Sequence, residues 1–294
     1  FNQDIGNWDV GNGTNFKRMF ALSAFNQDIG SWDVSKGTDF SEMFTNTTNF
    51  NQDIGSWDVS SGRDFHSMFS LATNFNQDIG SWDVSNSNNF AYMFYEADSL
   101  NQDLRNWTLN ENALLTDMFY GADLMQSNQG VGDTPSIYYF NPFPDKTTLQ
   151  TAIDEWYYSG SLTTKKLYGD INTWDVSQIT DFSELFKDKT AFNSDISKWD
   201  VSNGTDFSGM FDNARAFNQD ISGWDVSNGT DFNEMFSFAY DFNQDISSWD
   251  VSKGTDFASM FYRAYDFDQD IGSWDVSKGT DFSYMFSEAR VFDQ

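Results

Sequence analysis

Residues 25–49 read FNQDIGSWDVSKGTDFSEMFTNTTN, and this 25-residue pattern returns along most of the chain. Ten copies follow the core F-N-Q-D-I-x-x-W-D-V with few exceptions, and a tryptophan marks the frame of each one. These tryptophans are Trp8, Trp32, Trp57, Trp82, Trp107, Trp174, Trp199, Trp224, Trp249 and Trp274. Self-similarity at a fixed period is the signature of repeat architectures, so it decides the fold class before any other pattern.

Each repeat combines two local periodicities. Phe40, Met43, Phe44 and Thr47 follow the i, i+3, i+4, i+7 spacing of one face of a two-turn helix, with Asp39 as its N-cap. The first half of the repeat has the Ile-x-x-Trp-x-Val spacing of a leucine-rich repeat, which predicts a short strand with tryptophan and valine facing inward. We therefore predict an α/β repeat solenoid that resembles leucine-rich repeats, with one short strand and one short helix per 25-residue unit.

The period breaks in the middle of the chain, where all three prolines lie. We predict four segments, which are a five-repeat solenoid at 1–124, a linker or loop at 125–145, a helical cap at 146–166 and a second five-repeat solenoid at 167–294. The cap is predicted because Leu149, Ala152, Ile153, Trp156 and Tyr157 form a helical apolar stripe, which would cover the open end of the next repeat. One continuous solenoid with an insertion is the alternative.

The composition excludes several classes of protein. The 294 residues include 45 acidic and 16 basic side chains, for a formal charge of −29, and this sign opposes binding to nucleic acid and to anionic lipid. Without cysteine there is no disulfide and no thiolate zinc site. No stretch approaches the roughly 18 apolar residues of a membrane span. His66 is the one histidine, and no phosphate-binding loop occurs, so we expect no enzyme.

An aspartate occupies the fourth position of every repeat, and stacking would bring these carboxylates close together. The column consists of Asp4, Asp28, Asp53, Asp78, Asp103, Asp170, Asp195, Asp220, Asp245 and Asp270. Like charges about 5 Å apart repel one another, so something must compensate. Either each carboxylate accepts backbone N–H groups inside its own turn, as in Asx-turns, or cations bridge the column. The first reading is favoured, and the second stays open.

A second acidic column follows nine of the ten repeat tryptophans, and most repeats have a serine two residues later and another aspartate beyond. Oxygen groups at alternate positions suit hard cations, so a calcium site is a candidate, although the spacing is not that of an EF-hand loop. The candidate ligands are Asp33, Asp39, Asp58, Asp64, Asp225, Asp231, Asp250 and Asp256. A solvated face with N-caps is the simpler interpretation. No cofactor other than calcium is expected.

Five asparagines stand in N-x-S/T sequons and are candidate glycosylation sites if the protein is secreted by a eukaryote. They are Asn12, Asn46, Asn106, Asn203 and Asn228.

The strings Phe25-Asn-Gln-Asp-Ile-Gly-Ser-Trp-Asp-Val-Ser35 and Thr180-Asp-Phe-Ser-Glu-Leu-Phe186 resemble the bacterial-surface 26-residue repeat family. Such repeats occur in mycoplasma-type lipoproteins and are grouped with BspA-like leucine-rich repeats. The resemblance implies a surface-exposed, non-catalytic protein with adhesive or structural duty. The family usually carries valine before Thr-Asp, whereas most repeats here carry glycine, as at Gly37.

Two functions compete at this stage. The first is a non-enzymatic extracellular structural or adhesive protein, a segment of a longer filament, sheath or surface layer that self-associates head to tail or laterally. The matching registers of Phe1 and Phe292 are expected of an excerpt from a longer array. The alternative is a calcium-dependent adhesin that binds a glycan or a surface protein through its acidic strand face. Ice binding is less favoured, because the outward positions are acidic.

Overall fold

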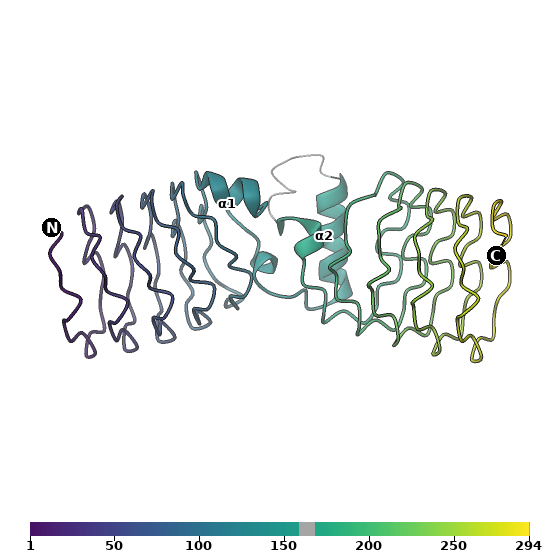
Figure 1. Ribbon diagram of the computed structural model, residues 1–294, viewed down its shortest axis with the longest axis horizontal. Helices are drawn as coiled ribbons and strands as arrows, with labels where there is room; N and C mark the ends of the chain where they lie inside the picture. Colours follow the sequence, from purple (N-terminus) through teal and green to yellow (C-terminus); the bar gives the residue numbers. More distant parts are fainter. Residues whose placement is uncertain (159–167, 294) are drawn as a thin grey trace. The chain divides into compact units, whose positions relative to one another are not determined.

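The computed structural model describes residues 1–158 and 168–293, and the chain divides into two compact units. Unit 1 comprises Phe1–Asn141 and Ser161–Asp170, and unit 2 comprises Pro142–Gly160 and Ile171–Gln294. The described helical elements are few and short, and they lie near the junction of the two sets of repeats in the sequence, the last of them inside the first repeat of the second set (Figure 1). They are α1 (Asp123–Asn128), η1 (Ile137–Tyr139), α2 (Lys146–Tyr158) and η2 (Ile171–Thr173).

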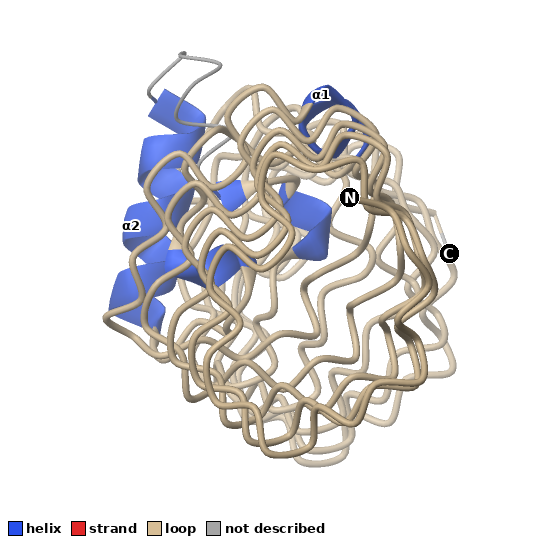
Figure 2. Cartoon of the chain, turned by 90° about the vertical axis from the view of Figure 1, so that its left-hand side faces the viewer, coloured by secondary structure: helices blue, strands red, loops and turns tan. Residues whose placement is uncertain are grey.

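The predicted α/β solenoid, with a strand and a helix in each repeat, is wrong. Each repeat forms one coil made of turns and irregular segments, and Figure 2 shows these coils as loop throughout. In the described residues, neighbouring coils meet through isolated parallel β-bridges such as Asp39↔Asp64 and Asp206↔Asp231, and no sheet forms. Each unit is therefore a stack of irregular coils, without the strand and helix of a leucine-rich repeat.

The segment predicted to be helical is a series of tight turns whose amides bond to the next coil. The N–H groups of Phe40 and Phe44 donate to the carbonyl oxygens of Asp64 and Met68, at 2.9 Å in both cases, while Met43 N–H donates back to Phe40 at 3.2 Å. A two-turn helix is marginal on its own, and here its amides find partners in the neighbouring coil instead. The helical spacing still selected the correct side chains, because all three of these hydrophobic residues in the segment are fully buried.

Each coil contains two positions with a left-handed backbone, which are the first and the last x of the F-S-x-M-F-x-x stretch. In the second coil they are Glu42, with φ 55°, and Asn46, with φ 53°. Every described non-glycine residue with positive φ lies at one of these positions, and two coils use Gly121 and Gly209 there. An L-residue in this region costs about 1 kcal/mol or more. The amides of Glu42 and Asn46 offset this by donating to the next coil at 2.8 and 2.7 Å.

Equivalent aromatic side chains stack on one another through the core of each unit. The rings of Phe20, Phe44, Phe69 and Phe94 follow one another at centroid distances of 5.5, 5.5 and 5.7 Å. The Phe44 ring also lies 3.9 Å from the ring of Phe50, the first residue of the next repeat. Full burial of such a side chain contributes roughly 1.5–3 kcal/mol, so these columns are the main stabilising feature of the fold.

The Trp-x-Val segment lies inward as expected, but it is held by a side chain and not by a strand ladder. Trp57 and Val59 are buried, and the Trp57 indole Nε1–H donates to the Ile29 carbonyl of the preceding coil at 3.0 Å. A Cβ at Gly37 would lie 2.4 Å from Phe40 Cζ. Glycine before Thr-Asp therefore makes room for the phenylalanine ring.

Non-repeat segments cover one end of each unit. In unit 1, the amides of Asp117 and Phe119 in the fifth coil donate to Thr134 Oγ1 and to the Asp133 carbonyl, at 2.8 Å each. The segment expected to be a linker or loop at 125–145 thus supplies the acceptors that a sixth coil would have supplied.

In unit 2, α2 lies against the first coil. Lys146 Nζ lies 2.8 Å from Asp181 Oδ1, and Gln150 Nε2 donates to the Leu185 carbonyl at 3.1 Å. Lys189, which is almost fully buried, pairs with Asp154 of α2 at 2.6 Å. The end of the cap predicted at 146–166 lies outside the described residues. No described helix has the length and apolar character needed to cross a membrane.

Candidate functional site

Nine of the fourth-position aspartates accept a hydrogen bond inside their own turn. Asp28 Oδ1 accepts Gly30 N–H at 2.9 Å, and Asp220 Oδ1 accepts Ser222 N–H at 3.0 Å. This is the Asx-turn geometry expected under the first of the two readings. Asp170 differs in its surroundings, because it directly precedes η2 (Ile171–Thr173).

The aspartates that follow the tryptophans make a similar turn, in most repeats with a serine two residues on. Asp33 Oδ1 accepts both Ser35 N–H at 3.0 Å and Ser35 Oγ–H at 2.6 Å. These two hydrogen bonds lower the pKa of the Asp33 carboxyl, and the equivalent serine bonds lower the pKa of Asp225 and of Asp250. The carboxylates of Asp33, Asp225 and Asp250 are therefore held ionised by their own turns.

The third column contains the bridging aspartates that precede each Phe-Ser turn. Asp39 Oδ1 accepts Ser41 N–H at 2.9 Å, as an N-cap would, although no helix follows. Burial raises the pKa of the Asp231 carboxyl, and the neighbouring Asp206 and Asp256 carboxylates raise it further. Like-charge repulsion between coils is thus felt most strongly where the carboxylates are partly buried.

The predicted calcium ligands are divided between the second and third columns. The second contains Asp33, Asp58, Asp225 and Asp250, and the third contains Asp39, Asp64, Asp231 and Asp256. Within the described residues, no three His, Cys, Asp or Glu side chains lie close enough together to hold a metal ion. The carboxylates instead cap separate turns, and the remaining electrostatic feature is a set of parallel rows of negative charge.

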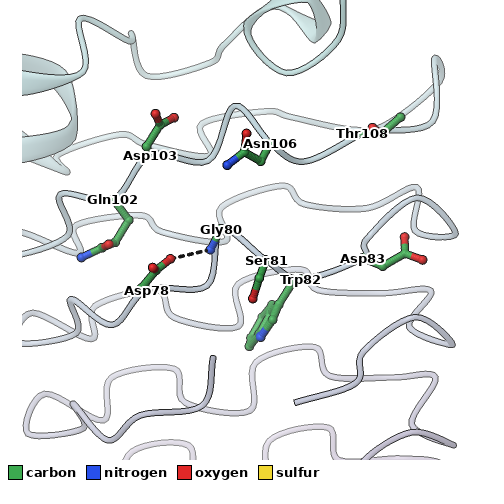
Figure 3. A pocket seen from close by; sticks show the side chains of 9 residues that line it. All are labelled: Asp78, Gly80, Ser81, Trp82, Asp83, Gln102, Asp103, Asn106 and Thr108. Atoms are coloured by element: carbon green, nitrogen blue, oxygen red, sulfur yellow. Dashed lines mark hydrogen bonds between the residues drawn. The ribbon is translucent and has the colours of Figure 1, made fainter. Parts of the chain in front are cut away.

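A hollow of 620 Å³ in unit 1 contains residues of two of these columns (Figure 3). It is lined by Asp78, Asp83 and Asp103 together with Gln102, Asn106, Thr108 and the backbone near Gly80. Figure 3 shows that the three carboxylates point in different directions, and that Asp78 faces the Gly80 amide that it caps. The hollow therefore presents separate polar groups to solvent without a pair of carboxylates facing one reacting atom.

The five sequons differ in how their amides are used. Asn203 Nδ2 and Asn228 Nδ2 donate to the carbonyls of Ser177 and Ser202 in the preceding coil, at 2.8 Å each. Their amide nitrogens, the atoms that a glycan would modify, are therefore engaged. Asn46 occupies a left-handed position.

Two further sequons lie at the surface. Asn106 is exposed, and Asn12 is exposed and uses its oxygen, which accepts from Lys36 Nζ at 2.9 Å. These two asparagines are the more accessible candidates for glycosylation.

Sequence reasoning missed the outward left-handed positions, which carry the most varied side chains of the repeat. The two glycines, Gly121 and Gly209, are the signal that was available, because glycine recurs at these positions without a turn motif around it.

A second missed feature is an amide ladder, in which each asparagine after the repeat's first phenylalanine caps the next coil. Asn51 N–H donates to Asn26 Oδ1 at 3.0 Å, and Asn76 N–H donates to Asn51 Oδ1 at 2.9 Å.

A family model described as "Mycoplasma protein of unknown function, DUF285" matches residues 1–61, 22–131, 154–252 and 230–294. These overlapping matches span both sets of repeats. Among curated proteins and among solved structures, none matches the chain.

Proposed function

Because this chain belongs to the Mycoplasma repeat family whose model spans it, a family of unknown function, we propose its function from the geometry of its coils. The protein is a non-enzymatic structural repeat protein of the cell surface, and its coil stacks are extended by further coils through their end faces. The observation that supports this most strongly is the directional hydrogen bonding between coils.

In the turn segment around Met-Phe, each coil donates backbone amides to the following coil and offers carbonyls to the preceding one, whereas Thr38 N–H donates in the opposite direction, to the Thr14 carbonyl at 2.8 Å. Arg18 N–H and Phe20 N–H, for example, donate to the carbonyls of Ser41 and Met43 at 3.0 and 2.9 Å. The two end faces of such a stack therefore differ in where their donors and acceptors lie, and each face complements the other. Heterologous faces of this kind generate open chains of subunits.

The outer faces of the two units are also apolar. On the first coil, Phe1 is 62% exposed and Trp8 is 53% exposed, whereas the equivalent Phe25 and Trp32 are buried. On the last coil, a hollow of 390 Å³ is lined by core residues of the repeat. They are Ile271, Gly272, Trp274, Val276, Phe282, Met285, Phe286 and Phe292. A further coil, of a longer polypeptide or of a second molecule, would bury both surfaces.

Self-association of the 294-residue polypeptide tests this proposal. Light scattering and electron microscopy at increasing protein concentration should reveal end-to-end oligomers. The double variant Phe1→Glu/Trp8→Glu should weaken association at least tenfold, because it places charge on an apolar face. Tyr158→Glu, at a residue that is 64% exposed in α2, is the matched control and should associate like the parent. Parent protein that stays monomeric throughout contradicts assembly through these faces.

Calcium-dependent adhesion is a second candidate, supported by the repulsion between carboxylates in neighbouring coils. Asp245 raises the pKa of Asp220, and Asp250 acts in the same way on Asp225, against the stronger lowering by their turn hydrogen bonds. Bound cations would screen this repulsion. Millimolar calcium should then raise the melting temperature and be required for attachment to a glycan-coated or protein-coated surface. Equal melting and attachment with calcium and with a chelator would contradict this candidate.

Extracellular location and kinship with BspA-like repeats are part of the same proposal. They are supported by the F-N-Q-D-I-x-x-W-D-V core of residues 25–34, whose asparagine, aspartate and tryptophan each make a coil-building hydrogen bond. The kinship is one of sequence, since the coils lack the strand and helix of leucine-rich repeats.

A further inference from the structure

A groove of 480 Å³ runs along the outer turn face of unit 2 and is lined by four successive coils. Its walls combine three carboxylates, three aromatic rings and three serines. These residues are Asp212, Glu234, Ser237, Phe238, Ser259, Tyr262, Tyr284, Ser287 and Glu288. Asp212 and Phe238 also line an adjoining hollow of 240 Å³, so the concave surface continues toward the preceding coils.

Most of the groove is built from left-handed positions. Glu234, Phe238, Ser259, Tyr284 and Glu288 have φ values between 54° and 61°. The fold requires only the backbone conformation there, and Gly209 meets that requirement in the same unit without a side chain. Large aromatic and acidic side chains are less favourable than glycine at positive φ. The backbone conformation alone therefore does not account for these side chains.

An arginine of the chain itself already shows which chemistry the groove accepts. The Arg263 guanidinium lies 5.3 Å from the Phe238 ring centroid and 5.2 Å from that of Tyr262. It also donates to both oxygens of Glu288, at 2.8 and 2.9 Å. A cation against aromatic faces with a carboxylate as counter-charge is a favourable arrangement when partly desolvated.

Two other carboxylates of the groove are not fully neutralised by cations of the chain itself. Asp212 is largely buried, its nearest cation is Lys187 at 3.4 Å, and burial raises the pKa of its carboxyl. No hydrogen bond or ion pair from the described residues reaches the Glu234 carboxylate. An incoming cation would therefore meet two incompletely neutralised carboxylates beside the exposed ring of Tyr284.

We propose that this groove, made by Asp212, Glu234, Phe238 and Tyr284, binds arginine or lysine side chains of a basic peptide segment in a partner protein. The net charge of −29 makes a second copy of this chain a poor occupant and a basic segment a complementary one. The rings select a cation through their faces, and the carboxylates supply the counter-charge. This binding is independent of coil-on-coil assembly, because its residues lie on the side of the stack and its probe is a separate peptide.

The test uses the full 294-residue polypeptide and a fluorescein-labelled peptide with four arginines separated by Gly-Ser, read by anisotropy. One peptide should bind per chain, and Phe238→Gly should weaken binding at least tenfold without changing the net charge. Leu71→Gly is the matched control, because Leu71 occupies the same left-handed position in unit 1 and should leave affinity unchanged. Equal affinity of the parent and Phe238→Gly, or many peptides per chain, would mean diffuse attraction to an acidic surface and overturn the proposal.

A second pair of variants tests the proposal even if Phe238→Gly fails to fold. Glu234→Gln should weaken binding about fivefold, whereas Glu42→Gln, at the equivalent position of unit 1, should not. The same peptide with citrulline in place of arginine, and a neutral hexasaccharide, are the chemical controls. If either binds as tightly as the arginine peptide, the groove recognises something other than a cation and the proposal is wrong.

Discussion

Two kinds of column run along each unit, one of phenylalanine rings inside and one of carboxylates outside. Stacking of identical coils stabilises the rings and destabilises the ionised carboxylates. The Phe211 and Phe236 rings lie 5.6 Å apart and gain from contact with their own kind. Outside, Asp250 destabilises the ionised form of Asp225, and the same is true of Asp206 toward Asp231.

The difference shows what a repeat must satisfy when every residue has its own copy as a neighbour. Apolar side chains can be stabilised by the neighbouring coil. A carboxylate must be stabilised within its own coil, and the turn hydrogen bonds of Asp225 to Ser227 do this at 3.0 Å. The left-handed positions obey neither rule, which is why their side chains vary from coil to coil.

Removing one phenylalanine ring from an interior column should have the largest effect on stability. Phe69→Ala deletes a fully buried ring that lies 5.5 and 5.7 Å from its counterparts in the two adjoining coils. Loss of contacts and the cavity left behind should lower the free energy of unfolding by about 3–5 kcal/mol. Chemical denaturation followed by tryptophan fluorescence measures the loss.

Phe236→Ala is the equivalent change in unit 2 and should have a loss of similar size. If either variant loses less than about 1 kcal/mol, the ring columns do not hold the coils together as described.

The exterior side can be tested by separating the charge of an aspartate from its hydrogen bond. Asp225→Ala removes the acceptor for Ser227 N–H and should lower stability by about 1 kcal/mol. Asp225→Asn keeps an acceptor oxygen but removes the charge, whose stabilisation by the serine hydrogen bonds outweighs the repulsion from Asp250, so its stability should lie between those of the alanine variant and the parent. Thermal melting of the three proteins in low salt provides the ranking. An asparagine variant as stable as the parent would show that the acceptor oxygen, without the charge, is enough to stabilise the turn.

The side chains that enter the core could be predicted from sequence, because burial follows spacing. Phe40, Met43 and Phe44 are all buried, although the helix that suggested them does not form. The same spacing arises in a helix and in these turns, and only the hydrogen-bond partners distinguish the two. Those partners lie in another coil, about 25 residues away, where local periodicity carries no information.

The acidic columns were found from sequence for the same reason, since the repeat period places equivalent residues above one another. The groove was not, because it depends on φ. The residue types at Phe238 and Tyr284 do not indicate a left-handed backbone, and the groove forms only when successive coils bring these positions together.

The pH dependence of stability should separate the two classes of aspartate. Serine hydrogen bonds lower the pKa of Asp225 and Asp250 in the folded state, so their contribution is present above the unfolded pKa of about 3.9. It is lost as the pH falls through the lower folded pKa. Burial raises the pKa of Asp212 and Asp231, so these groups lower stability when ionised. That cost disappears as the pH falls through their folded pKa.

Stability should therefore rise as the pH is lowered from 7 toward about 4, and fall below that. Relief of self-repulsion acts in the same direction on the upper limb, because the isoelectric point is about 4.1. Melting temperatures across this range for Asp231→Asn should show a flatter rise than the parent. Asp225→Asn should instead flatten the acid limb, because its amide does not titrate. If both variants keep the parent profile, repulsion spread over the whole chain dominates, and the buried and exposed columns do not differ in their effect on stability.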